Sequence, residues 1–410
     1  MDVTGPWIRT AAAAGLLRDG VPLPTVFARM SALAASTGAL NLGQGFPDDD
    51  PPALVADAAV AAIREGRNQY PPGAGEPTLR EAIAAHQAAW YGLDWDPDTE
   101  VLVTTGATEA LAATLLALVQ PGDEVLTLEP FYDQYAALIG LTGATHRTVP
   151  LTSATDPVSG DLVLGVDEQQ LRDAFSARTR VVLVNTPHNP TGLMLEQSVL
   201  AAIVEQAQRY DALIVTDEVY EHLTFGQPHQ PLAVLPGARE RTVSISSAGK
   251  TFAVTGWKIG WLTAPSALVT AITGVKQWLT YTSGAPFQPA VAAGLGMDRS
   301  AFAQLTEDLR ERRDLLTAGL RDIGFQVAVP AAGYFTVADA SQFGEADGAA
   351  LAERLPTEAG VVAIPLSAFH HADSSGAQDS ASRLRFAFCK SRSTIEQALE
   401  RLDAWAAVRR

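Results

Sequence analysis

A lysine that follows a β-branched run is the residue best suited to covalent chemistry. The run Thr242–Ser246 leads through four small residues, beginning at Ser246, to Lys250. Small residues let the backbone turn sharply and approach a ligand closely. A lysine amine with a depressed pKa forms Schiff bases with carbonyl compounds. An exposed surface lysine is the alternative interpretation of Lys250 taken alone.

An apolar run also ends in a carboxylate. The segment Leu213–Asp217 reads LIVTD, and Glu218, Val219 and Tyr220 follow it. If this strand continues, Asp217 and Val219 face the same side, because side chains alternate along a strand. A carboxylate at the end of a buried strand needs a hydrogen-bonding or cationic partner. Asp217 could cap a helix or bind a metal ion, and pairing with a protonated pyridine nitrogen is the sharper hypothesis.

Two loops carry groups that suit polar ligands. The loop Asn185–Gly192 (NTPHNPTG) is stiffened by two prolines and could present the amide of Asn189, although an ordinary Asn-Pro turn also explains it. The segment Thr104–Ala110 (TTGATEA) joins an expected strand to an expected helix through Gly106. Free N–H groups at a helix N-terminus bind phosphate, and the helix dipole adds to this attraction.

These motifs occur together and in a characteristic order. The chain contains NLGQGFPD, NPTG, DEVY and SSAGKTFAVTGWKIGW. With them, it resembles the class I aminotransferases, which are fold-type I pyridoxal-phosphate enzymes, over nearly its full length. Within that class it is similar to the kynurenine aminotransferase/glutamine transaminase K branch and to the neighbouring N-succinyldiaminopimelate aminotransferases. The resemblance implies pyridoxal 5'-phosphate as cofactor and an amino-acid substrate with a 2-oxo acid, 2-oxoglutarate above all, in a ping-pong mechanism.

The resemblance assigns roles around the cofactor ring. Lys250 would bind the cofactor as a Schiff base and, once freed, shuttle a proton between the substrate and the cofactor. Asp217 would keep the pyridine nitrogen protonated. Asn189 and Tyr220 would hydrogen-bond the ring's phenolate oxygen. The two ring faces would contact Val219 and Tyr132.

The resemblance also assigns anion-binding residues. The phosphate would lie on the backbone of Gly106, Ala107 and Thr108, beside Ser247 and Lys258, where many class I enzymes carry Arg in place of the lysine. Tyr70 would reach the phosphate of a neighbouring subunit, which implies a homodimer. The substrate α-carboxylate would be held by Arg385, with Asn189 and the backbone of Gly45; a surface Arg on an edge strand is the alternative. Phe46 would contact the substrate.

The substrate side chain is less well defined. Aspartate aminotransferases hold the distal carboxylate with a second arginine, but the corresponding stretch 277–288 (QWLTYTSGAPFQ) contains no Arg or Lys. Aromatic residues could line a side-chain pocket or belong to the core and an interface: Phe46, Tyr70, Tyr132, Trp278 and Tyr281. The motif combination favours N-succinyl-LL-2,6-diaminopimelate, an intermediate of lysine biosynthesis. The alternatives are kynurenine, glutamine, methionine or aromatic amino acids, or a cysteine-S-conjugate β-lyase reaction.

Alternating elements must position these residues. Helical stretches such as Glu109–Val119 and Ser198–Tyr210 separate most of a series of apolar runs, which favours a mostly parallel α/β sheet. These expected strands are Val101–Thr105, Glu124–Leu128, Arg180–Asn185, Leu213–Asp217, Thr242–Ser246 and Ile259–Ala264. The resemblance makes this a seven-stranded sheet between helices.

A smaller α+β region should follow the sheet. It would contain a helix over Phe302–Ile323, a closing helix over Thr394–Ala407, and strands between them. Those strands are expected at Gln326–Val329, Tyr334–Ala338, Val361–Ile364 and Leu384–Phe388. We expect an N-terminal arm that completes the small domain (1–50), a large cofactor-binding domain (51–290) and a C-terminal small domain (291–410).

Composition limits the partners of this chain. Its 46 acidic and 29 basic residues give a formal charge of −17, which argues against nucleic acid or anionic membranes as partners. The longest apolar run, from Ala110 to Val119, is about half of a membrane-spanning helix. The single cysteine, Cys389, excludes an intramolecular disulfide and a cysteine-rich metal site. We expect a cytoplasmic enzyme without a bound metal.

Overall fold

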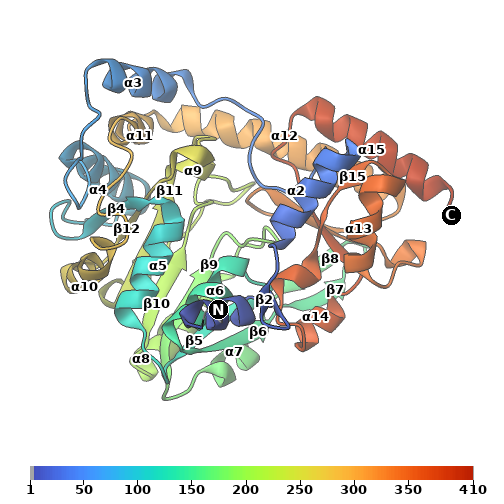
Figure 1. Ribbon diagram of the computed structural model, residues 1–410, viewed down its shortest axis with the longest axis horizontal. Coiled ribbons are helices and arrows are strands. Elements are labelled where there is room, and N and C mark those ends of the chain that lie inside the picture. The colour runs from blue at the N-terminus through green and yellow to red at the C-terminus, as the bar shows by residue number, and fades with distance from the viewer. Residues whose placement is uncertain (1–3, 410) are drawn as a thin grey trace.

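The computed structural model describes residues 4–409, and a seven-stranded sheet is its largest element (Figure 1). The strand order is β4-β12-β11-β10-β9-β5-β6. Strand β12 runs antiparallel to both of its neighbours, and the other pairings are parallel, which confirms the expected mostly parallel sheet. The strands are β4 (Val101–Thr105), β5 (Glu124–Glu129), β6 (Thr145–Pro150), β9 (Thr179–Asn185), β10 (Leu213–Asp217), β11 (Thr242–Ser247) and β12 (Ile259–Thr263).

Helices cover both faces of this sheet (Figure 1). One face packs against α5 (Gly106–Leu118), α6 (Asp133–Thr142) and α10 (Ser266–Lys276). The other face packs against α3 (Ala53–Arg64), α4 (Pro77–Tyr91), α7 (Glu168–Ala174), α8 (Gln197–Arg209) and α11 (Phe287–Leu295). In β9, Val181 and Leu183 join the first core, whereas Val182 and Val184 join the second. The strands are therefore apolar without interruption because both faces are buried.

The C-terminal region builds a second, antiparallel sheet in the order β13-β14-β17-β16. Its strands are β13 (Gln326–Ala328), β14 (Phe335–Asp339), β16 (Ile364–Pro365) and β17 (Arg383–Ala387). Its helices are α12 (Arg299–Ile323), α13 (Gly348–Glu358), α14 (Ser375–Asp379) and α15 (Arg392–Ala407).

The N-terminal segment packs against two different regions. Met30 of α2 (Val26–Thr37) and Leu42 belong to the same core as the C-terminal sheet. Helix α1 (Pro6–Ala13) lies instead on α6, where the backbone of Gly140 approaches Ala13 closely. The division of the chain at residues 50 and 290 stays a prediction, and its outermost residues, 1–3 and 410, lie outside the described part.

Two strand expectations need correction. The single strand expected over Val361–Ile364 is wrong, because the chain forms β15 (Val361–Val362) and β16, which pair with different partners. Strand β15 pairs with β3 (Leu40–Asn41), and β16 pairs with β17. Strand β6 escaped the search for apolar runs because it is an edge strand in which only Val149 is buried.

Minor elements complete the described chain. Two short antiparallel pairs are β1 (Leu17–Arg18) with β2 (Val21–Pro22), and β7 (Thr152–Thr155) with β8 (Leu162–Gly165). The short helix α9 (Ala248–Thr251) follows β11 directly. Between residues 4 and 409, none of the helices combines the length and apolar character needed to cross a bilayer.

Candidate active site

The parallel strands β9, β10 and β11 end at one edge of the large sheet, at Asn185, Asp217 and Ser247. Ligands of such sheets bind at this edge. A cavity of about 390 Å³ lies there. Every site residue predicted from the sequence lines it except Tyr70: Gly45, Phe46, Gly106, Ala107, Thr108, Tyr132, Asn189, Asp217, Val219, Tyr220, Ser247, Lys250, Lys258 and Arg385.

Lys250 projects into this cavity from α9. Its Nζ donates a hydrogen bond to the carbonyl oxygen of Gly45 at 3.3 Å, and its own carbonyl oxygen accepts one from the hydroxyl of Tyr334 at 2.5 Å. Burial lowers the pKa of Lys250, against the opposing influence of Asp217. A lysine with a lowered pKa is neutral, and hence nucleophilic, in a larger fraction of molecules.

Asp217 reaches the cavity with one oxygen bound and one free. Its Oδ2 accepts a 2.5 Å hydrogen bond from the hydroxyl of Tyr135, whereas its Oδ1 has no hydrogen-bond partner among residues 4–409. Burial raises the pKa of Asp217 to about 6, although Tyr135 and Lys250 act in the opposite direction. A buried acceptor without a donor suits a ligand that brings a proton and a positive charge.

Arg385 is a buried cation without a carboxylate partner in the described chain. It lies in β17, is 1% exposed, and donates to Asn189 Oδ1 at 3.0 Å and to the carbonyl oxygen of Gly43 at 2.7 Å. Its guanidinium carbon lies 3.7 Å from the ring centroid of Phe335, and its Nε has no hydrogen-bond partner. Burial lowers the pKa of Arg385 to about 10. A buried guanidinium with a free N–H group and no carboxylate partner is suited to bidentate binding of a substrate carboxylate.

The start of α5 forms a cradle for an anion. The helix begins at Gly106, whose φ of 70° lies in the left-handed region that favours glycine. Beside this first turn, Lys258 Nζ donates to Thr108 Oγ1 at 3.1 Å. A side chain at Gly260 would come within 2.5 Å of the backbone of Gly106, so glycine is required there too. Unpaired N–H groups, the helix dipole and a lysine together suit a phosphate group.

The match with a known family agrees with this geometry. The family described as aminotransferase class I and II matches residues 37–402 of the chain. The chain belongs to this family. Its members use pyridoxal phosphate, and this aminotransferase has groups that fit each part of it. The free Oδ1 of Asp217 fits a protonated ring nitrogen, Lys250 fits the carbonyl, and the first turn of α5 fits the phosphate.

Named relatives cover nearly the whole aminotransferase. A probable N-succinyldiaminopimelate aminotransferase from Mycobacterium tuberculosis is 48% identical over 93% of this chain and 96% of its own length. Its solved structure superposes with a TM-score of 0.88 over 93% of this chain and 97% of that one. A methionine aminotransferase from Escherichia coli is 38% identical over 92% and 95%. A human kynurenine–oxoglutarate transaminase is 36% identical over 93% and 88%.

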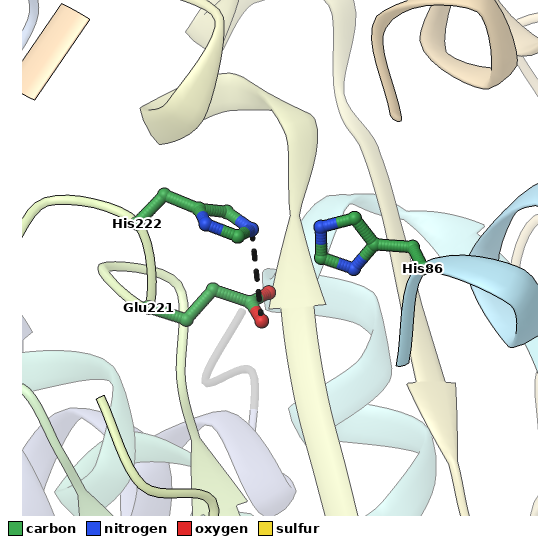
Figure 2. A group of neighbouring side chains, drawn as sticks. All are labelled: His86, Glu221 and His222. Carbon is green, nitrogen blue, oxygen red and sulfur yellow. Dashed lines mark ion pairs between the residues drawn. The ribbon is translucent and has the colours of Figure 1, made fainter. Parts of the chain in front are cut away.

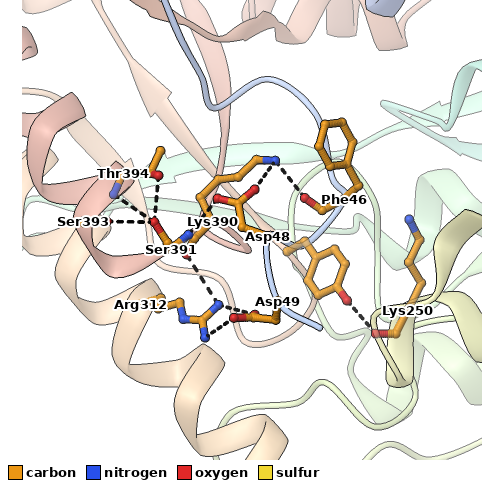
Figure 3. A network of polar contacts seen from close by, with 10 residues as sticks. Phe46, Asp48, Asp49, Lys250, Arg312, Lys390, Ser391, Ser393 and Thr394 are labelled. Carbon is orange, nitrogen blue, oxygen red and sulfur yellow. Dashed lines mark hydrogen bonds and ion pairs between the residues drawn. The ribbon is translucent and has the colours of Figure 1, made fainter. Parts of the chain in front are cut away.

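The loop that carries Gly45 and Phe46 is tied down by residues that the sequence analysis missed (Figure 3). Lys390 Nζ donates to the carbonyl oxygen of Phe46 at 2.8 Å and to Asp48 Oδ1 at 3.1 Å, and it lies 3.7 Å from the centroid of the Phe46 ring. Arg312 pairs with Asp49 on the same loop. Glycine is required at position 45, because a side chain there would come within 2.3 Å of the Phe335 ring. The loop therefore has little freedom to move away from Lys250.

Tyr70 and two other aromatic residues lie away from this cavity in the single chain. Tyr70 is 85% exposed and Trp278 is 81% exposed. The ring centroids of Tyr70 and Tyr281 are 6.0 Å apart. Lys276 immediately precedes the stretch that lacks basic residues, but it is buried and donates to the carbonyl oxygens of Gly73 and Tyr281. These backbone contacts, rather than a ligand, occupy its amine.

Proposed function

We propose that this aminotransferase acts on N-succinyl-LL-2,6-diaminopimelate, with 2-oxoglutarate as the amino-group acceptor. The observation that supports this substrate is the 48% identity with the Mycobacterium tuberculosis relative, against 38% and 36% for the methionine and kynurenine relatives. The two half-reactions use one site in turn, which is a ping-pong mechanism. This substrate would place the enzyme in lysine biosynthesis.

Lys250 is the proposed covalent anchor and proton carrier. When bound, pyridoxal phosphate supplies a carbonyl that takes up the amino group and a ring that delocalises the negative charge left on the α-carbon. The Lys250 amine would remove the proton from that α-carbon and deliver it to the cofactor carbon that takes up the amino group. Its lowered pKa supports this role, because only the neutral amine can act as a base.

The surrounding side chains orient the ring in this proposal. Asp217 Oδ1 would accept a hydrogen bond from the protonated ring nitrogen, and its negative charge would keep that nitrogen protonated and the ring cationic. Asn189 and Tyr220 hydrogen-bond the phenolate oxygen. Val219 and Tyr132 contact the two ring faces. The free Oδ1 and the burial of Asp217 support this orientation, since a cationic partner would satisfy a carboxylate that nothing else in the described chain neutralises.

Arg385 is the proposed partner of the substrate α-carboxylate. Its guanidinium is positioned by hydrogen bonds but has no carboxylate partner in the described chain, so it would bind both oxygens of the substrate carboxylate. Asn189 and the backbone of Gly45 would lie beside that carboxylate, and Phe46 would contact the substrate. Substrates without an α-carboxylate would leave Arg385 buried and unpaired, so they are selected against.

Phosphate binding is proposed to involve two chains. Gly106, Ala107, Thr108, Ser247 and Lys258 hold the phosphate within one subunit. Tyr70 completes the phosphate site of the neighbouring subunit in a homodimer. The large exposed fraction of Tyr70 in the single chain supports an interface at this surface. A cytoplasmic location remains part of the proposal and rests on the single cysteine.

Methionine or an aromatic amino acid is the second candidate substrate. The absence of Arg and Lys from residues 277–288 favours it, because this stretch offers no cationic side chain for a distal carboxylate. A cysteine-S-conjugate β-lyase reaction is a further alternative on the same scaffold, since a carbanion at the α-carbon can expel a β-leaving group.

A panel of amino donors distinguishes these candidates. Single half-reactions with purified holoenzyme should be fastest, in kcat/KM, for N-succinyl-LL-2,6-diaminopimelate, and 2-oxoglutarate should complete the cycle. A strong preference for methionine, kynurenine, glutamine or an aromatic amino acid would overturn the substrate proposal. Release of pyruvate and ammonia from cysteine conjugates, without transamination, would replace it with the β-lyase reaction.

A further inference from the structure

Three ligand-type side chains converge on the far side of the strand that carries Asp217. His86 lies in α4, and Glu221 and His222 follow β10 (Figure 2). The candidate ligand atoms of the three residues all lie within 4.8 Å of one another. His222 Nε2 and Glu221 Oε2 are 3.9 Å apart. None of these side chains takes part in the proposed aminotransferase chemistry.

The two imidazoles have nitrogens without a partner. His86 is 4% exposed and His222 is 7% exposed, yet Nε2 of each lacks a hydrogen-bond partner among residues 4–409. Aromatic rings surround them instead: the His222 ring lies 4.6 Å from that of Trp90 and 4.7 Å from that of Phe302. Buried ring nitrogens normally have a donor or acceptor opposite them. The unpaired nitrogens therefore call for a ligand that imidazole can bind.

The charges of the cluster point to a cation. Glu221 and Glu218 are buried, and neither forms an ion pair with a lysine or arginine in the described chain. Their ion-pair partners in the described chain are imidazoles: His222 for Glu221, and His229, whose Nε2 lies 3.2 Å from Glu218 Oε2. Burial raises the pKa of Glu221, lowers that of His86 to about 4 and holds that of His222 well below its usual value. Neutral imidazoles keep the lone pair that metal binding needs.

We propose that His86, Glu221 and His222 bind one divalent cation, and that zinc is the preferred ion. Two imidazole nitrogens and one carboxylate oxygen form a common zinc ligand set, in which a water molecule takes the fourth position. Zinc–ligand bonds of about 2.0–2.1 Å place tetrahedral ligands about 3.3 Å apart, so small side-chain rotations would close the present arrangement. The sequence analysis expected no metal, because His86 is remote from Glu221 in the chain and no local motif joins them.

Neighbouring hydroxyls already orient the carboxylate. Tyr91 donates to Glu221 Oε2 at 2.8 Å, and Ser246 donates to Oε1. A carboxylate has about four lone-pair positions, so two remain for a metal ion. Such outer hydrogen bonds fix the direction of a ligating group. A cleft lined by Glu221, His222 and His229 adjoins the cluster and offers a route from solvent.

The bound ion would stabilise the segment that carries active-site residues, by linking it to helix α4. It would join α4 to the segment that directly follows Asp217 and Tyr220, so metal binding would stabilise the folded chain. Catalysis itself would not use the ion. Its removal should lower the melting temperature, while the kcat of the holoenzyme that remains folded should change little.

Metal content tests the proposal in the full-length, untagged holoenzyme. The protein is dialysed against zinc, passed through gel filtration and analysed by inductively coupled plasma mass spectrometry. We expect about one zinc per chain, loss of that zinc in His86→Asn and in His222→Asn, and retention in His371→Asn, a control that removes a partly buried imidazole outside the cluster. A wild-type protein with far less than one zinc, or unchanged zinc in both cluster variants, overturns the proposal.

Anomalous diffraction from the wild-type protein tests the same site without requiring that the variants fold. Crystals of the zinc-treated holoenzyme, measured on both sides of the zinc absorption edge, should give an anomalous peak between His86, Glu221 and His222. A peak at another position, or none, overturns the proposal. In parallel, zinc should raise the melting temperature of chelator-treated wild type and should not raise that of His86→Asn.

Discussion

Two polar regions of this aminotransferase differ in whether their hydrogen-bonding groups have partners. At the active-site cavity, Asp217 Oδ1 and Arg385 Nε have no hydrogen-bond partner among residues 4–409. The second region lies where β5 and β6 meet the C-terminal part of the chain. There the His146 ring is hydrogen-bonded through Nε2 to Thr127 Oγ1 at 2.8 Å and through Nδ1 to His371 Nε2 at 2.9 Å. Glu129 extends this second network by accepting from the backbone N–H of His371 at 2.7 Å. Asp217 and Arg385 are buried, whereas His146 and His371 are half-buried, and in the described chain only the first of these regions has charged groups with an atom that lacks a hydrogen-bond partner.

Whether polar groups have hydrogen-bond partners distinguishes residues that bind a ligand from residues that stabilise the fold. A satisfied network stabilises the position of the elements that it joins, here β5, β6 and residue 371. Unsatisfied charges cost stability in the empty enzyme, and a ligand that completes them recovers this cost as binding energy. The first region should therefore respond to substitution in activity, and the second in stability.

The largest expected effect comes from Lys250→Ala. Loss of the proton carrier should lower the rate of each half-reaction by about 10²–10⁴-fold, the usual contribution of general acid–base catalysis, and loss of the covalent anchor adds to it. The variant should still bind cofactor, because the Asp217 carboxylate and the α5 cradle are unchanged. Stopped-flow half-reactions and a cofactor titration measure both properties. Turnover at the wild-type rate would contradict the proposed role.

Arg385→Gln should have the next largest effect. Removing the partner of the α-carboxylate should lower kcat/KM by about 10²-fold or more, as expected for truncating one member of a buried charged pair. The ligand-free variant should be at least as stable as the wild type, because a buried cation without a carboxylate partner is removed.

Arg383 provides the matched control on the same strand. It is also buried, but it pairs with Asp339 at 3.3 Å. Arg383→Gln should lower the melting temperature and leave kcat/KM nearly unchanged. If both variants lose stability and keep activity, the distinction between an unpaired and a paired buried arginine fails.

The residues that line the candidate site could mostly be predicted because they lie in local motifs. Lys250, Asp217 and Asn189 each end a strand of the same sheet or follow one closely, so alternation and parallel pairing bring them together. Tyr135 and Lys390 could not be predicted in this way. They reach the site from a helix and from the C-terminal region, and their partners, Asp217 and Phe46, are remote in sequence.

Contacts between residues that are remote in sequence were also the part of the fold that could not be predicted. Strands β9, β10 and β11 were found because they are buried on both faces and read as continuous apolar runs. The pairing of β15 with β3 depends on tertiary contacts between the two ends of the chain, which no local pattern records. The His86–Glu221–His222 cluster was missed for the same reason.

Tyr135→Phe should lower kcat less than Arg385→Gln lowers kcat/KM, because it removes a hydrogen-bond donor to Asp217 and leaves the carboxylate in place. The Tyr135 hydroxyl lowers the pKa of Asp217, so its loss should raise that pKa. Because the proposal needs ionised Asp217, the acidic limb of the kcat profile should move to higher pH, and kcat near neutrality should fall by about 10-fold or less. A purely structural role for Tyr135 would lower stability without moving the limb.

The smallest effect concerns His146 in the satisfied network and appears as a pH dependence of stability. Burial lowers the pKa of His146 from 6.5 to about 3. Between these values the unfolded chain binds a proton at this site and the folded chain does not, so folding stability falls as pH decreases from about 6.5. This one group contributes at most about 1.4 kcal/mol per pH unit across that range. In His146→Gln, urea unfolding at pH 7.5 and at pH 5 should show a smaller loss of stability on acidification than in the wild type, with kcat/KM unchanged at pH 7.5. An equal loss in both proteins would mean that the imidazole is not held neutral, and a fall in kcat/KM would mean that the network reaches the active site after all.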